Sequence, residues 1–430
     1  MAYFHDAFGN APRLGATVSS SIMTVFNLTS VLFTILATVR GSKKKSNPMR
    51  RVVWSLYLSI AAFMVLVASV GLRGTEPLVT AMPYYLFLLL LSVALAISQA
   101  FMQSGAMVIC TQLSIDGTLM GYLQMGQALQ GVFGSVVNFV STVMAMHVEK
   151  REQGAAETRA WENASAATVV FVVTILLQVG TRLCLTRAAQ VPSVEKHIQT
   201  WETNMLSGDT ETSEPNAWEH LLHVQKRILP WVASIFCIFL VTLGIYPALT
   251  AQVRTVNPHA SAWLEDASVF VALHIVLLNV GDLIGRRLPT LSPYFLIRRG
   301  WVAMLATTAR FAFLPLFLAC NIVKENGARR AWALPDAAFF GLVLLLGITT
   351  GCTATSVFLS GPKTVDGTMA HSMPPSDTPA GADVEYDPLL DDYDPHENRD
   401  AAIASMLLAF WLVMGLMAGS CFSFVVLALT

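Results

Sequence analysis

Residues 81–114 read AMPYYLFLLLLSVALAISQAFMQSGAMVICTQLS, a stretch without a charged side chain. A helix needs about 20 apolar residues to cross the hydrocarbon core of a bilayer, and this stretch is longer than that. Backbone N–H and C=O groups inside lipid must be paired within their own segment, so a continuous apolar run predicts a helix. We expect residues 81–114 to form a transmembrane helix that is either tilted or extends past the membrane.

The rest of the chain repeats this pattern. Only 13% of the 430 residues are charged, whereas soluble domains carry roughly 25%. This composition excludes a soluble globule and predicts an all-α, polytopic membrane helical bundle with about ten transmembrane helices. The other apolar runs lie at about 17–40, 52–72, 119–146, 164–187, 229–253, 266–286, 300–320, 334–360 and 400–429.

Composition and motifs also exclude several functions. The net charge of −1 gives no basic excess for binding nucleic acid. HExxH, GxSxG and Walker motifs are absent, so we predict neither an enzyme nor an ATP-driven pump. None of the six cysteines forms a CxxC pair, and we predict no metal site and no cofactor. A secondary transporter fits best.

Lysine and arginine in the short loops predict the orientation in the membrane. The loop at 41–51 and the segment RRLPTLSPYFLIRR at 286–299 are both strongly basic and are placed in the cytoplasm. Counting spans from them places residues 1–16 and the C-terminus outside. Asn163, in an Asn-Ala-Ser sequon, also falls outside and is a candidate glycosylation site. Three basic residues fall outside against the rule: Lys324, Arg329 and Arg330.

Two long polar segments divide the chain, and both are placed in the cytoplasm. Residues 188–228 form a predicted linker between an N-terminal bundle at 1–187 and a C-terminal bundle at 229–430. Residues 361–399 are rich in Pro, Ser and Asp and are predicted to be a disordered loop within the C-terminal bundle.

The predicted disordered loop raises two further hypotheses. Glu385, Leu389 and Leu390 have the spacing of an acidic dileucine signal, which suggests sorting machinery as a partner. The acidic loop as a whole also motivates an alternative function, a non-transporting receptor or scaffold that presents residues 361–399 to a partner.

Charged residues inside spanning helices are costly and tend to face a cavity or a partner. Asp282 and Arg286 are four residues apart, so they lie on one helix face and can pair. Arg286 is close enough to the inner end to reach the headgroups instead. Arg310 lies in the middle of its run, too deep to do so, and should face the protein interior. Its role as a structural or a substrate-binding residue stays open.

The third and fourth runs are rich in glutamine. An amide both donates and accepts hydrogen bonds, which suits recognition of nucleobase or sugar edges. The alternative is hydrogen bonding between helices, a common role of buried amides. The residues concerned are Gln99, Gln103, Gln112, Gln124, Gln127 and Gln130.

Several segments resemble the equilibrative nucleoside transporter family. Asn279-Val-Gly-Asp282-Leu-Ile-Gly285-Arg286 is similar to its DxxGR turn, and the segment from Arg310 through Pro315 to Cys320-Asn321 is similar to its Arg…Pro…CN helix. Three further segments resemble its seventh, fifth and last helices: Phe239–Pro247, Gly126-Gln127 with Gly131, and Gly415–Phe424. Ala128 and Gln130 depart from the fifth-helix pattern GQGxAG.

The resemblance implies a major-facilitator-like fold with eleven helices in a 6 + 5 arrangement. Ala2-Tyr3-Phe4 resembles the end of the family's first helix, so we expect that helix to be missing and ten to be present. The implied function is alternating-access transport of nucleosides or nucleobases, either facilitative or proton-coupled. The implied location is the plasma membrane or a vacuolar or lysosomal membrane.

Residue roles follow position by position from the resemblance. Gln103 resembles the fourth-helix glutamine that binds the nucleoside, and Asp282 and Arg286 resemble the eighth-helix pair on the ribose side. Arg310, Gln127 and Asn279 resemble positions with gating or structural roles. The implied partners are a purine or pyrimidine nucleoside and the lipid bilayer.

Overall fold

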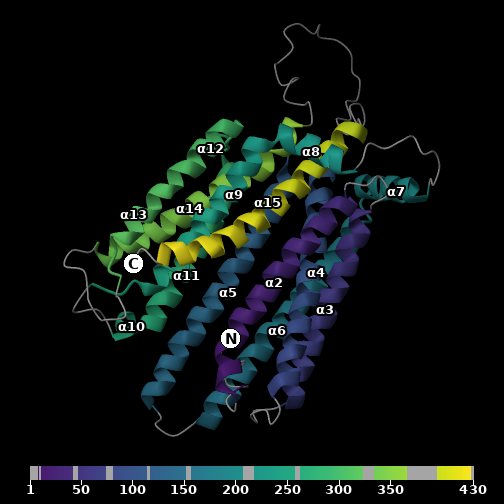
Figure 1. Ribbon diagram of the computed structural model, residues 1–430. Coiled ribbons are helices and arrows are strands. Elements are labelled where there is room, and N and C mark those ends of the chain that lie inside the picture. The colour runs from purple at the N-terminus through teal and green to yellow at the C-terminus, as the bar shows by residue number, and fades with distance from the viewer. Residues whose placement is uncertain are drawn as a thin grey trace. The chain divides into compact units, whose positions relative to one another are not determined.

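The computed structural model describes residues 8, 11–41, 47–73, 81–113, 117–151, 156–206, 217–256, 262–322, 334–365 and 395–427. These residues are almost entirely helical, as the apolar runs predict (Figure 1). The first half holds α2 (Pro12–Gly41), α3 (Pro48–Arg73), α4 (Ala81–Leu113), α5 (Thr118–Arg151), α6 (Ala156–Ala188) and α7 (Pro192–Leu206). The second half holds α8 (Ala217–Arg227), α9 (Leu229–Ile245), α10 (Ala262–Glu265), α11 (Ala267–Leu291), α12 (Gly300–Ala309), α13 (Phe313–Leu318), α14 (Asp336–Ser360) and α15 (Pro395–Leu427).

Nine of the described helical segments are long and apolar enough to cross a membrane. They coincide with nine of the predicted runs, so the class of helical membrane protein is confirmed. The tenth run, 119–146, lies within α5, a continuous helix of 34 residues. Its three glutamines and four glycines make α5 less apolar than the other spans.

The described chain forms two compact units. Unit 1 comprises residues 1–106 and 140–210, and unit 2 comprises residues 107–139 and 211–430. α4 and α5 therefore contribute residues to both units. The bundle boundaries predicted from the sequence, at 187 and 229, stay a prediction.

The predicted linker contains two helices that the sequence analysis did not anticipate, α7 and α8. α8 is amphipathic: Leu221 and Val224 are buried, whereas Trp218 is exposed. Its buried side packs on α15, where His220 Nε2 lies 2.8 Å from Asp400 Oδ1. A short amphipathic helix shows no long apolar run, which is why the search for spans missed it.

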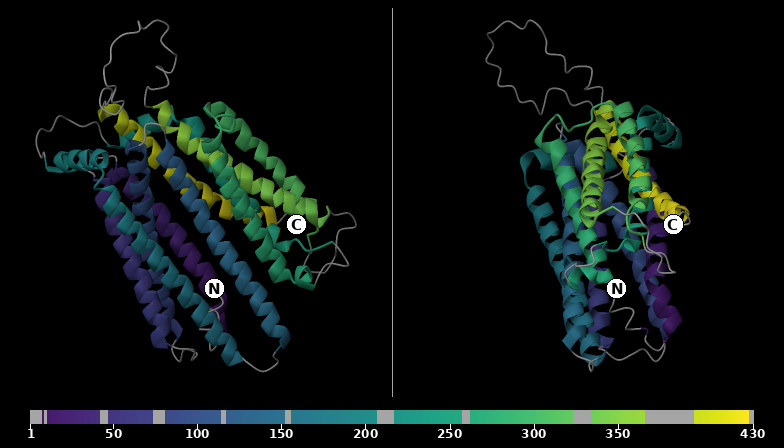
Figure 2. Two further views of the ribbon diagram at one scale, coloured as in Figure 1. Left: turned by 180° about the vertical axis from the view of Figure 1, so that it is seen from behind. Right: turned by 90° about the vertical axis from the view of Figure 1, so that its left-hand side faces the viewer.

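Unit 1 packs its long helices α2, α3, α4 and α6 side by side (Figure 2). α3 and α6 form its main contact. Hydrogen bonds between helices supplement apolar packing: the Ser98 hydroxyl donates to the Ser55 carbonyl at 2.6 Å, and the Gln178 amide donates to the Ser59 hydroxyl at 2.9 Å. Such bonds are a usual role of polar residues in spanning helices.

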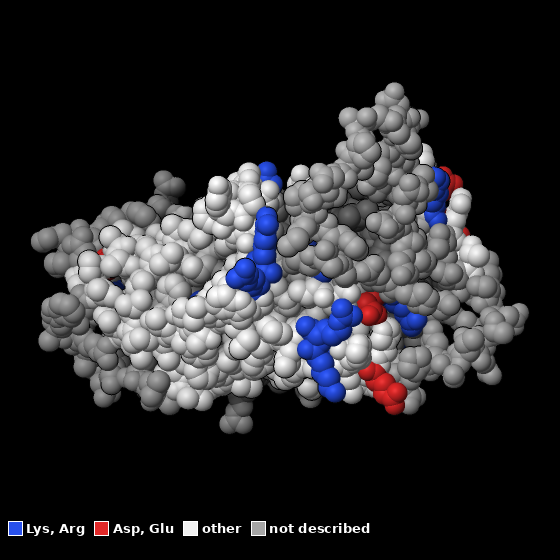
Figure 3. Space-filling model, turned by 90° about the horizontal axis from the view of Figure 1, so that it is seen from above, with Lys and Arg blue, Asp and Glu red and all other residues white. Residues whose placement is uncertain are grey.

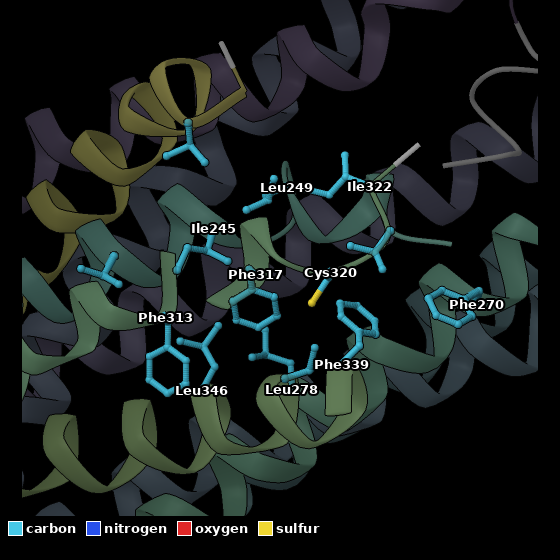
Figure 4. Packing of buried hydrophobic residues seen from close by; sticks show 14 residues of the cluster. Ile245, Leu249, Phe270, Leu278, Phe313, Phe317, Cys320, Ile322, Phe339 and Leu346 are labelled. Carbon is cyan, nitrogen blue, oxygen red and sulfur yellow. The ribbon is translucent and has the colours of Figure 1, made fainter. Parts of the chain in front are cut away.

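Unit 2 is built on two helix pairs, α9 with α15 and α11 with α14 (Figure 1). An aromatic cluster fills the space between α9, α11, α13 and α14 (Figure 4). Phe339 stacks on Phe270 with centroids 5.6 Å apart and meets Phe317 edge to face at 6.1 Å. This core fixes α11 and α14, the helices that carry the candidate site.

The predicted run at 300–320 is not one regular helix. α12 ends at Ala309, a 3₁₀ turn covers Arg310–Ala312, and α13 begins at Phe313. Pro315 has no N–H and cannot donate to the carbonyl four residues earlier, which weakens the α-helical ladder at this point. The interruption brings Arg310 into a tighter turn than the sequence predicts.

Asn321 closes α13 against the segment that follows α9. Its side chain is buried and donates to the carbonyls of Arg254 at 3.1 Å and Thr255 at 3.2 Å. The backbone of the same segment forms an isolated antiparallel bridge between Val253 and Ile322. The Cys-Asn element noticed in the sequence therefore has a structural role here.

One end of unit 2 is basic. Arg227 ends α8, Arg287 lies in the last turns of α11, Arg299 caps the start of α12, and Lys363 follows α14. Lys and Arg side chains are visible on this end in the space-filling view (Figure 3). The orientation in the membrane, predicted from the basic loops, stays a prediction.

Some predictions fall outside the described residues. These are Glu385, Leu389 and Leu390, most of the predicted disordered loop, and the basic residues Lys324, Arg329 and Arg330. Asn163 lies in α6, but its side chain is also outside the described part. The two ends of the predicted loop are ordered, because a 3₁₀ turn covers Pro362–Thr364 and α15 begins at Pro395.

Candidate functional site

Glycines bring α11 and α14 into backbone contact. Gly281 and Gly285 on α11 face Gly347 and Gly351 on α14. A Cβ at Gly285 would overlap the carbonyl oxygen of Ile348, and one at Gly351 would overlap that of Asp282. Each helix thus carries a small-xxx-small pair, which lets spanning helices approach closely. The interlock holds Asp282 and Arg286 firmly beside α14.

The ion pair predicted from the spacing of Asp282 and Arg286 is present. Arg286 Nε donates to Asp282 Oδ2 at 2.9 Å, and the two side chains are 9% and 17% exposed. The other carboxylate oxygen, Asp282 Oδ1, is buried without a hydrogen-bond partner among the described residues. An unsatisfied buried acceptor costs about 1–3 kcal/mol. Asp282 therefore keeps one buried oxygen that can still accept a hydrogen bond.

A second residue holds Arg286 from α5. Arg286 Nη1 donates to Gln124 Oε1 at 2.5 Å and lies 3.3 Å from the Gln124 carbonyl oxygen. Gln124 is completely buried, and its Nε2 has no partner among the described residues. In the sequence Gln124 is one of six amides on neighbouring runs, and no local pattern distinguishes it as a site residue.

Arg310 is buried in a cage of hydroxyl groups. Its Nη2 donates to Thr242 Oγ1 at 2.8 Å and Thr350 Oγ1 at 2.7 Å, and its Nη1 donates to Thr349 Oγ1 at 3.1 Å. Each hydroxyl in turn donates to a carbonyl one helical turn earlier. No described carboxylate forms an ion pair with Arg310. The prediction that Arg310 faces the interior is confirmed by its 3% exposure.

Asn279 and Gln127 have different surroundings. Asn279 Nδ2 donates to the Ile275 carbonyl at 2.8 Å, and its Oδ1 occupies the space that a Cβ at Gly131 would take. Gln127 is partly buried on α5 next to Gly126, where an added Cβ would meet nothing within 4 Å. Of these two glycines, only Gly131 is required for close packing of α5 on α11.

Gln103 belongs to α4 and to unit 1, where it is half-buried. The neighbouring Ser104 hydroxyl accepts a long hydrogen bond of 3.4 Å from Arg51 Nη1. Arg51 also donates to the Ala37 carbonyl. The structure thus groups Asp282, Arg286 and Arg310 in unit 2 and describes Gln103 separately in unit 1.

Comparison with known proteins agrees with these motifs. Residues 89–373, more than half of the chain, match the model of a nucleoside transporter family. Human equilibrative nucleoside transporter 1 is 23% identical over 96% of this chain and 85% of its own length. The mouse protein of the same name is 26% identical over 48% of this chain, and the match spans only 38% of the mouse protein. The crystal structure of the E. coli fucose:proton symporter FucP covers 99% of this chain and 90% of that chain, with 12% identity and a TM-score of 0.43, too low to establish a shared fold.

Proposed function

Because this multi-pass membrane chain belongs to the nucleoside transporter family, we propose that it carries nucleosides across a membrane by alternating access. The observation that carries the proposal is the buried Asp282–Arg286 pair with its unpartnered oxygen, Asp282 Oδ1. A carboxylate of this kind accepts hydrogen bonds from the sugar hydroxyls of a nucleoside.

Each candidate residue has a proposed role of its own. Asp282 accepts from a ribose hydroxyl, and Arg286 both holds the carboxylate in place and donates to the substrate. Gln103 pairs with the base, since its amide both donates and accepts. Arg310, Asn279 and Gln127 act in structure or gating, and the hydroxyl cage of Arg310 supports a structural role for that residue.

Uptake measurements test the proposal directly. The full-length protein, expressed in cells that lack nucleoside transport, should give saturable uptake of uridine or adenosine. Adenine as a third substrate tests whether free nucleobases are carried as well. The proposal would be wrong if the folded protein, present in a membrane that the substrates reach, transports none of these compounds.

Energy coupling is a separate question about the same site. Facilitated transport should equilibrate the nucleoside without accumulation, whereas proton coupling should concentrate it when the outside is acidified. Accumulation that collapses with a protonophore would support the coupled form, and accumulation-free uptake would support the facilitative form.

The membrane of residence is the plasma membrane or a vacuolar or lysosomal membrane. We propose that Glu385, Leu389 and Leu390 bind sorting machinery that directs the protein to the latter. Fluorescence microscopy of Leu389→Ala/Leu390→Ala should then show the protein moved to the cell surface. An unchanged distribution would remove the sorting role.

A further inference from the structure

The contact between Gln124 and Arg286 joins two helices. Arg286 receives one partner from its own helix, the Asp282 carboxylate at 2.9 Å, and one from α5, the Gln124 amide oxygen at 2.5 Å. Gln124 and Arg286 are 162 positions apart in the chain. The substrate-contacting arginine is therefore also the polar link between α11 and α5.

α5 meets α11 along a single face. Gly121, Gln124, Met125 and Gly131 lie on one stripe of a helix with 3.6 residues per turn. Thr290 Cγ2 lies 2.6 Å from where a Cβ at Gly121 would be, and Arg287 Nη1 lies 3.8 Å from Met125 Sδ. Two arginines of α11 make polar contacts with α5, and the Gln124–Arg286 bond is much shorter than the Arg287–Met125 contact.

Two buried groups beside Arg286 lack partners. Asp282 Oδ1 is an acceptor without a donor, and Gln124 Nε2 is a donor without an acceptor, among the described residues. Both side chains contact Arg286, so the two groups flank one guanidinium. A hydroxyl group can donate to the carboxylate and accept from the amide at the same time. The two groups therefore offer the acceptor and the donor that a sugar hydroxyl can use.

We propose that Gln124 is a positioning residue that couples substrate binding to the α5–α11 contact. Without substrate, Gln124 holds Arg286 and keeps α5 against α11. A sugar hydroxyl that binds between Asp282 and Gln124 competes for these groups, weakens the Gln124–Arg286 bond and allows α5 to separate from α11. This inference rests on the proposed transport of nucleosides through Asp282 and Arg286.

Two substitutions at Gln124 separate coupling from a merely structural role. Gln124→Leu removes the bond to Arg286 and also the Nε2 donor that the sugar hydroxyl would accept from, so KM should rise about tenfold, as expected for one lost hydrogen bond to the substrate. Gln124→Glu keeps the shape but forms a charge-assisted bond. That bond should resist separation and lower Vmax per folded molecule while KM changes less.

Gln130→Leu, on an exposed position of the same helix, is the matched control and should leave both parameters at wild-type values. Identical KM and Vmax in the wild type, Gln124→Leu and Gln124→Glu would overturn the proposal. If Gln124→Leu does not fold, the Vmax of Gln124→Glu decides the question in the same way.

A cross-link tests the contact without relying on transport. The Cβ atom of Thr290 lies 3.9 Å from the position of a Cβ at Gly121, within the range for a disulfide. Gly121→Cys/Thr290→Cys should therefore cross-link on oxidation, faster with Gln124→Glu and more slowly with Gln124→Leu. Each single cysteine variant serves as a control for the native cysteines.

The same cross-linking experiment distinguishes a failure of the proposed nucleoside transport from a failure of the proposed coupling through Gln124. A wild-type protein that transports no nucleoside, with cross-linking rates that still follow the residue at position 124, would remove the proposed function but keep Gln124 as the link between helices. In a protein that transports adenosine, added adenosine should slow cross-linking, and reduction should restore uptake that the disulfide has blocked. Cross-linking unaffected by adenosine would overturn the coupling.

Discussion

Two arginines are buried in unit 2, and their surroundings differ. Arg286 contacts a carboxylate and an amide, and both of these partners keep an unsatisfied hydrogen-bonding atom. Arg310 contacts three hydroxyls that are already satisfied through their own helices. Around Arg286 the unsatisfied atoms belong to its two partners, whereas at the second site the partners are satisfied and the unsatisfied atom is Nε of Arg310 itself. Buried charge alone therefore does not distinguish the two arginines; the hydrogen-bonding state of their partners does.

The largest effect on the Arg286 site is expected from Asp282→Asn. It removes the countercharge of Arg286 and the proposed acceptor of the sugar hydroxyl. Truncating one partner of a buried, hydrogen-bonded charge pair costs about 2–5 kcal/mol, so uptake per folded molecule should fall by about 100-fold. Nucleoside uptake normalised to folded protein measures the effect. Unchanged uptake would remove Asp282 from the site.

The next test compares the arginines by stability. Arg286→Met leaves the Asp282 carboxylate buried without a countercharge, which costs about 3–5 kcal/mol. Arg310→Met leaves three hydroxyls that still donate to their own carbonyls, and replacing a buried charge by an apolar side chain is often nearly neutral. Thermal unfolding in detergent should show a much larger loss for Arg286→Met. Equal losses would contradict the difference between the two environments.

Two glycines on α14 provide a matched pair of variants that test the close contact with α11. Gly351→Ala places a Cβ against the carbonyl of Asp282, whereas at Gly341 an added Cβ meets nothing within 4 Å. Overpacking costs about 1–3 kcal/mol, so Gly351→Ala should lower the unfolding temperature and also reduce uptake. Gly341→Ala should leave both unchanged or raise stability slightly. Similar behaviour of the two variants would show that the helices are not in close contact.

The smallest effect is expected at the Arg310 cage. Thr349→Val removes one acceptor of the three, at 3.1 Å. The loss of a single neutral acceptor from a charged donor costs about 1.5–3 kcal/mol at most, and less where other acceptors remain. Unfolding temperature should fall slightly while KM stays at the wild-type value. A change in KM would assign Arg310 to substrate binding.

Local patterns in the sequence predicted local structure well. Apolar runs located nine spans, and a spacing of four predicted the Asp282–Arg286 pair. The acceptors of Arg310 come from residues 39 to 68 positions away in the chain, and Gln124 lies 162 positions from Arg286. Such contacts depend on how helices pack, which no periodicity within one helix records. The same reason explains why six glutamines could be noted but not ranked.

Apolar runs alone also do not predict irregularities of the backbone or short amphipathic helices. Such a search finds length and hydrophobicity, so α7 and α8, which are short and amphipathic, were assigned to a linker. The 3₁₀ turn at Arg310 lies inside a run of sufficient length and was predicted as ordinary helix. Pro315 gave a signal for that interruption, since proline removes a hydrogen bond from the helix.

The four glycines between α11 and α14 have a mechanical consequence. Backbones in direct contact leave no soft side chains between the helices to deform, so the pair behaves as one stiff lever. Asp282 and Arg286 both lie on that lever, one turn apart. Tilting it moves the two charges together and leaves the distance between them unchanged, so a conformational cycle of the proposed carrier would reorient its charged pair without separating it.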